Sequence, residues 1–76
     1  MPTLNVVGPK VQHARLNHKP PITQEQLAIK LQILGWEIDR FGISKIERQE
    51  RQITDKELLL LARALGVPVN QLLGER

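Results

Sequence analysis

Cysteine is absent from this 76-residue chain. Without thiols the chain can form no disulfide scaffold, thiolate metal site or cysteine nucleophile. Long hydrophobic runs are also missing, because the longest strictly apolar run, Leu58–Ala62, is far shorter than the roughly 20 residues of a membrane helix. Residues 1–7 lack the basic start and the apolar stretch of a secretory signal. We therefore expect a soluble, cytoplasmic protein with no membrane partner.

Groups of residues that would carry catalysis or bind a metal are missing as well. His13 and His18 are five positions apart with no other ligand type beside them, which does not match the ligand pattern of a zinc site. Ser44 has no histidine and aspartate placed to activate it as a nucleophile. We predict that the protein binds no metal, needs no cofactor and is not an enzyme.

The charge that is present is modest and unevenly placed. Eleven Lys and Arg residues face eight Asp and Glu residues, which leaves a net charge of +3. The excess comes from residues 1–24, where Lys10, Arg15 and Lys19 have no acidic counterpart. A basic balance fits a polyanionic partner but does not require one, because many small basic domains bind no nucleic acid.

Turn and cap residues divide the chain into five short helices. Pro20-Pro21 ends the first, because the residue before a proline avoids the α region. Thr23 with Gln26, and Thr54 with Glu57, have the spacing of capping boxes that start helices. The predicted helices are 10–18, 24–34, 39–48, 55–65 and 69–73. With no strand candidate, we predict a compact all-α five-helix domain over residues 8–74, preceded by a flexible arm over residues 1–7.

The third predicted helix, 39–48, has two different faces. Ile43 and Ile46 are three positions apart and can be buried together with Ile38 from the preceding turn. The other side carries three cations, a hydroxyl and an aromatic ring: Arg40, Phe41, Ser44, Lys45 and Arg48. A helix that is merely solvated would have no reason to expose the aromatic ring.

Three blocks of the sequence resemble a known family. The chain contains Thr23-Gln24-x-x-Leu27-Ala28-x-x-Leu31, then Ile43-Ser44-x-Ile46-Glu47-Arg48, then Leu61-Ala62-x-Ala64-Leu65-Gly66-Val67. In this order they resemble the helix-turn-helix domain of phage-repressor and Cro-like regulators, the Xre family, over residues 8–74. The resemblance implies a lambda-repressor-like fold in which helix 39–48 enters the major groove of DNA and helix 24–34 lies across the DNA backbone.

The resemblance also implies roles for particular residues. Base contacts fall on Arg40, Phe41, Ser44 and Lys45. Contacts to the DNA backbone fall on Thr23, Gln24, Gly42, Arg48, Gln49 and Arg51. Arg15 and Glu47 match a largely buried ion pair between the first and third helices. The surface for a second copy of the chain falls on Val69, Gln71 and Leu73.

The sequence departs from the family pattern around the second helix and at the end of the third. Gln32 stands where the family typically has a glycine, and Ile38 is ten positions beyond Ala28 where about five is usual. We therefore expect a lengthened second helix and an enlarged turn. A further departure is Gln49, at a position where the family often has a glycine, and a longer first turn results from the two prolines.

Each of two aromatic residues has two possible contacts. Phe41 can contact a thymine methyl group or pack against Trp36 of the enlarged turn. Trp36, the sole tryptophan, is expected to cover the junction between the second and third helices, with a contact to another protein or to the DNA backbone as the alternative.

The functional expectation is a sequence-specific DNA-binding transcriptional regulator, a repressor, that binds double-stranded DNA as a symmetric homodimer. An antitoxin would bind DNA in the same way and also bind a toxin. A third possibility is a protein-interaction module on the same fold that does not bind DNA. Three acids near the third helix favour that third reading: Glu37, Asp39 and Glu50.

Overall fold

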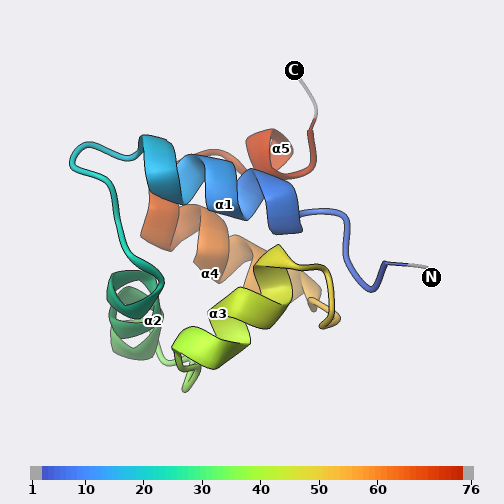
Figure 1. The fold of residues 1–76 in the computed structure, drawn as a ribbon, viewed down its shortest axis with the longest axis horizontal. Coiled ribbons are helices and arrows are strands. Elements are labelled where there is room, and N and C mark those ends of the chain that lie inside the picture. The colour runs from blue at the N-terminus through green and yellow to red at the C-terminus, as the bar shows by residue number, and fades with distance from the viewer. Residues whose placement is uncertain (1–2, 75–76) are drawn as a thin grey trace.

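The structure, a computed structural model, describes residues 3–74 and is all-α over that range (Figure 1). No helix in this part of the chain could cross a membrane, since the longest has only 11 residues. The predicted five-helix architecture is confirmed. The helices are α1 (Gly8–Asn17), α2 (Gln24–Ile33), α3 (Arg40–Glu47), α4 (Asp55–Leu65) and α5 (Val69–Leu72).

Both predicted capping boxes are present and fix where α2 and α4 begin. The Thr23 hydroxyl accepts from the Gln26 amide at 3.0 Å, and the Gln26 side chain accepts from the Thr23 amide at 2.9 Å. Thr54 and Glu57 make the equivalent pair of bonds at 3.1 and 3.0 Å. Each box satisfies amide groups that the first turn of a helix leaves without an internal partner.

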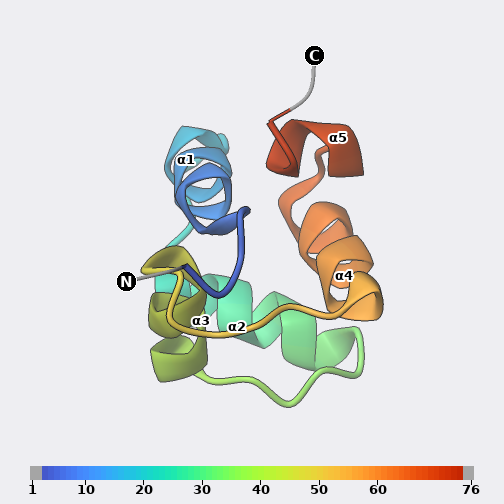
Figure 2. The same cartoon turned by 90° about the vertical axis from the view of Figure 1, so that its right-hand side faces the viewer.

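One core lies between all five helices. In Figure 2, α1 and α5 lie at the top, α2 and α3 at the bottom, and α4 connects the two levels. The largest fully buried side chains come from every helix: Val11, Leu27, Leu31, Ile43, Ile46, Leu61 and Leu72. Because α3 is held by its inner isoleucines, its other side remains free for solvent.

The connection between α2 and α3 is ordered by its own contacts. Gly35 adopts φ +99°, a left-handed conformation that favours glycine, and turns the chain out of α2. The Gln32 side-chain amide donates to the Ile38 carbonyl at 2.9 Å, and Ile38 itself is buried. Trp36 packs half-buried against the core. Gln32, at the position of a family glycine, thus stabilises the enlarged turn.

The described part of the expected N-terminal arm lies against the end of α3. The Asn5 side-chain oxygen accepts from the amides of Val7 at 3.1 Å and Gly8 at 2.8 Å, and so caps α1. Its side-chain amide donates to the carbonyls of Ile46 at 3.1 Å and Arg51 at 2.8 Å. Met1 and Pro2 of the arm lie outside the described residues.

Candidate nucleic-acid interface

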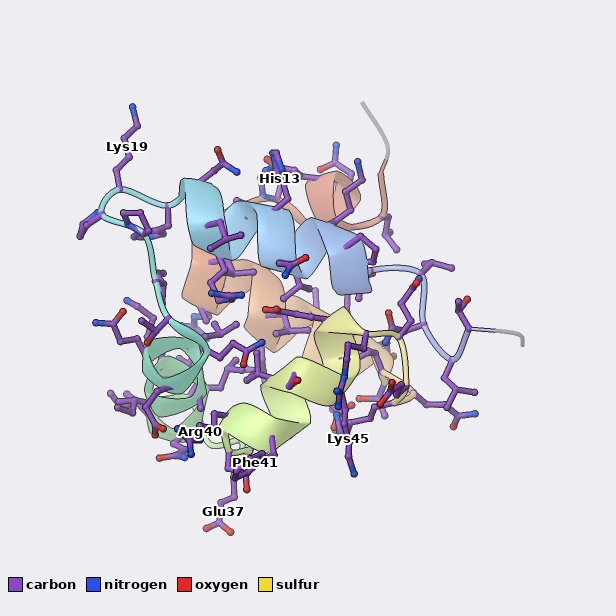
Figure 3. The ribbon with its side chains drawn as sticks, viewed as in Figure 1. His13, Lys19, Glu37, Arg40, Phe41 and Lys45 are labelled. Carbon is purple, nitrogen blue, oxygen red and sulfur yellow. The ribbon has the colours of Figure 1, made fainter. Side chains whose placement is uncertain are left out.

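The outer side of α3 carries several exposed predicted site residues. Asp39 starts the helix by accepting from the Gly42 amide at 2.9 Å. Arg40, Phe41 and Lys45 are exposed, and Figure 3 shows all three along the same edge of the molecule, directed away from its body. Ser44 lies half-buried on the same helix. The side chains expected to reach base edges are therefore presented by one helix.

Arg40 and Phe41 form a mixed cationic and aromatic surface. The guanidinium carbon of Arg40 lies 5.0 Å from the centroid of the Phe41 ring, within the range of a cation–π interaction. The Phe41 side chain nevertheless remains 63% exposed. The pair can therefore offer hydrogen-bond donors and an apolar contact side by side.

A buried ion pair fixes the position of α3 behind this surface. Arg15 donates to both carboxylate oxygens of Glu47, at 2.7 Å from Nε and 2.9 Å from Nη2. The two side chains are only 9% and 3% exposed. Arg15 also donates to the Ile22 carbonyl at 3.0 Å, and the Gln24 amide donates to Glu47 at 3.0 Å. The network joins α1, the start of α2 and the end of α3, and it pairs the Glu47 charge, which would otherwise repel phosphate.

Two glycines mark close contacts of α3 with its surroundings. A Cβ atom on Gly42 would lie 2.6 Å from Cγ1 of Ile38, and one on Gly8 would lie 2.8 Å from the Glu47 carbonyl oxygen. Both distances are far below van der Waals contact. Because Gly42 has no side chain, Ile38 of the enlarged turn can pack closely against α3. Because Gly8 has none, the start of α1 can approach the end of α3.

The segment after α3 carries three of the predicted backbone-contact residues. Arg48 is exposed, and its Nη2 lies 3.3 Å from a carboxylate oxygen of Glu50. Gln49 adopts φ 62°, which explains why glycine suits this position. Its side-chain amide donates to the Asn5 carbonyl at 2.9 Å. Gln49 is thus held by the N-terminal segment, whereas Arg48 extends into solvent.

Arg51 is held between an aromatic ring and an acid. Its guanidinium carbon lies 5.2 Å from the centroid of the Trp36 ring, and its Nη2 lies 3.3 Å from a carboxylate oxygen of Glu57. The side chain is 35% exposed, and its Nη1 is buried without a hydrogen-bond partner. Trp36 therefore packs against the core and also positions Arg51 beside the enlarged turn.

Acidic residues lie close to the cations of α3. Figure 3 shows Glu37 extending from this edge near Phe41, and Asp39 is exposed at the start of α3. The local charge of the surface is therefore mixed, and a polyanion approaching it would meet both cations and at least one carboxylate.

The residues expected at an interface between two copies lie around α5. Val69 is half-buried and packs against the core, whereas Gln71 and Leu73 are exposed. Leu73, 43% exposed, lines a hollow of about 290 Å³ together with Leu4 and Val6 of the N-terminal segment. The remaining lining residues are Asn5, Val7, Ile53, Thr54, Asp55 and Leu58.

Sequence reasoning missed Asn5 altogether, and it assigned Gln24 to the DNA backbone without its structural contact to Glu47. Asn5 links the start of α1 to the end of α3, and Gln24 donates to the buried Glu47 carboxylate. An asparagine shortly before a helix start is a recognisable capping signal. Nothing local in the sequence marks the bond between Gln24 and Glu47, because the two residues are 23 positions apart.

Comparison with known proteins places this geometry in a family. A family model described as helix-turn-helix matches residues 22–72, which is more than half of the chain. The protein therefore belongs to the Xre-like, Cro/C1-type helix-turn-helix family, whose members are DNA-binding regulators. This is not a family of enzymes. Searches of curated proteins and of solved structures found no match.

Proposed function

We propose that this protein is a sequence-specific transcriptional repressor that inserts α3 into the major groove of double-stranded DNA. One observation carries the proposal: Arg40, Phe41 and Lys45 are exposed together on one edge of α3. The major groove admits an α-helix, and within it Arg or Lys can bond to guanine while an apolar side chain contacts the thymine methyl group. Ser44 adds a hydroxyl that can serve either a base or a phosphate.

The contacts to the DNA backbone come from both ends of the motif. Thr23 and Gln24 stand at the start of α2, where the backbone amides and the helix dipole favour a phosphate. Gly42, Arg48, Gln49 and Arg51 approach the backbone from α3 and the segment after it. Arg48 is the most accessible of these cations, because its side chain is 60% exposed.

The repressor acts in the cytoplasm as a symmetric homodimer on an operator with two half-sites. A single recognition helix covers only a few base pairs, so two copies are needed for the area and affinity of a specific site. The surface around Val69, Gln71 and Leu73 supports self-association, since most residues that line the adjoining hollow are apolar and none is a cation. The molecule measures 30 × 27 × 20 Å, which is compatible with half-sites about 34 Å apart.

Selection of bound sites from random duplex DNA tests the proposal. We expect a palindrome whose half-sites are centred about 10 base pairs apart. The Arg40→Ala/Lys45→Ala double variant should fail to enrich the same motif although it remains folded. Enrichment of a single half-site would refute the dimer, and a set of sequences without any common motif would refute base recognition by α3.

A protein-interaction module without DNA binding is the second candidate. It is favoured by the acids that pair with possible phosphate contacts, since Glu50 lies beside Arg48 and Glu57 beside Arg51. Salt separates the two functions, because binding through several phosphates weakens steeply between low and moderate salt. An antitoxin would behave like the repressor in this assay and would in addition bind the toxin encoded by a neighbouring gene.

A further inference from the structure

The outer side of α2 carries an apolar surface that the fold and the DNA interface leave unused. Leu27, Ala28 and Leu31 are buried on the core side of α2, whereas Ile29 is 47% exposed and Ile33 is 79% exposed. The two isoleucines are one helical turn apart, on the opposite side of the helix from the buried residues. Figure 1 shows α2 at the edge of the molecule, with no other helix beyond it.

Two hollows extend this apolar strip along both ends of α2. One, of about 340 Å³, is lined by Ile29 and Lys30 together with His18, Pro20, Pro21, Ile22 and Gln26. The other, of about 270 Å³, is lined by Lys30 and Ile33 together with Leu34, Arg63 and Ala64. We call Ile29, Ile33 and these two hollows the α2 outer surface. Two apolar side chains and two hollows along one helix can receive a helical segment or an extended peptide with several apolar side chains.

The Lys and Arg residues that line the two hollows are not matched by any acid in either lining. Lys30 lines both hollows and Arg63 lines the second, and no acidic residue lines either one. Glu25, the acid nearest in sequence on α2, is exposed but belongs to neither hollow. Apolar groups between cations complement a partner that carries apolar groups between carboxylates, since matched charge steers association and excludes like-charged partners.

We propose that the α2 outer surface binds a partner protein through a segment in which apolar side chains are flanked by Asp or Glu. A second copy of this chain is a poor occupant. A symmetric contact would place the same surface on both sides, so Lys30 and Arg63 of one copy would face the same two cations of the other and repel them. The hollow beside Leu73 suits a second copy better, as it contains no cation. DNA is also disfavoured, because exposed isoleucines offer nothing to a phosphate.

Selection from a displayed peptide library tests both the acidic character of the bound segment and the position of its binding site. The probe is a library of random peptides of about 16 residues, long enough for four helical turns, selected on the immobilised full chain. We expect the recovered peptides to combine apolar positions with Asp and Glu. The strongest peptide should then shift the amide NMR signals of residues 22–34 and 63–64 in the isotope-labelled chain.

Matched variants locate the site. Ile33→Ser should weaken binding of the selected peptide by about tenfold or more, as expected for a central apolar contact, and Lys30→Gln should weaken it most at low salt. Leu59→Ser is the control, because Leu59 is a similarly exposed apolar residue on another helix at 58%, and it should leave binding unchanged. All three positions are exposed, and the circular dichroism spectra should match that of the parent chain.

Several results would overturn the proposal. Enrichment of neutral or basic peptides in place of acidic ones contradicts the charge argument. Unchanged binding in the Ile33→Ser variant contradicts the location. Shifts of the same amide signals with protein concentration alone indicate a second copy, and the same shifts with anionic lipid vesicles indicate a membrane surface. DNA binding is measured separately, and Ile33→Ser should leave it unchanged, so the two proposals can fail independently.

Discussion

The inner and outer sides of α3 use charge in opposite ways. On the inner side, Glu47 is buried and Arg15 holds it by two short hydrogen bonds, so this charge serves the fold. On the outer side, Arg40 and Lys45 are exposed. Buried charge is costly unless it is fully paired, whereas exposed charge contributes little to stability and is available to a ligand. Substitutions on the two sides should therefore affect different measurements.

The largest expected effect is on stability and comes from Arg15→Ala. Removing the guanidinium leaves a buried carboxylate without its partner, which typically costs about 3–5 kcal/mol. Small domains are stable by only about 0.05–0.15 kcal/mol per residue, so the variant should be unfolded or close to unfolding at room temperature. Urea denaturation followed by circular dichroism measures the loss.

A second variant controls for the loss of side-chain packing. The Arg15→Met/Glu47→Leu double variant removes both charges while it retains apolar volume, and it should recover most of the stability lost in Arg15→Ala. An unchanged melting temperature in Arg15→Ala would contradict the structural importance of the pair. Equal instability of the double variant would assign the loss to packing instead of charge.

Arg40→Ala should act on DNA recognition and leave stability unchanged. A good contact between an arginine and guanine discriminates against the wrong base by about 1–3 kcal/mol, so binding should weaken and the preference at one base position should relax. Lys45→Ala should relax a different position. The measurement is the affinity for the selected operator and for its single-base variants. A loss that is uniform over all of these sequences would show that α3 does not read bases.

Arg48→Ala and Arg51→Ala should separate the effect of an exposed phosphate contact from that of one that also packs against the fold. Each should weaken all DNA sequences about equally and reduce the slope of log affinity against log salt by about 1. Arg51→Ala should in addition lower the free energy of unfolding by about 1 kcal/mol, because its stacking on Trp36 is lost. A salt slope that stays unchanged in Arg51→Ala would show that this arginine serves the fold alone.

The helices could be predicted from the sequence because their signals are local. Thr23 and Gln26 are three residues apart, and this pair alone determines where α2 begins. The contacts of Asn5 could not be predicted, since its amide donates to carbonyls 41 and 46 positions away. In the sequence, Gln32 stands out only as a departure from a family pattern. Its bond to Ile38 exists because the enlarged turn brings that carbonyl back to α2.

The same distinction applies to the site. The outward position of Arg40 and Lys45 follows from the helical period once Ile43 and Ile46 are assigned to the core. Their surroundings do not follow from it, because the stack of Arg51 on Trp36 joins residues brought together by the fold. Periodicity therefore predicts which residues face outward, and only the tertiary structure indicates which of these are free to bind a ligand.

The smallest expected effect comes from Glu37→Gln, which tests the mixed charge of the outer edge. Glu37 extends from the same edge as Phe41 (Figure 3), and its carboxylate should repel nearby phosphates. Removing this charge should raise the affinity for all DNA sequences severalfold at low salt, and the gain should shrink as salt screens the interaction. A weaker affinity confined to one base position would instead show that the Glu37 carboxylate accepts a hydrogen bond from a cytosine amino group. That result would make the enlarged turn part of the base-reading surface.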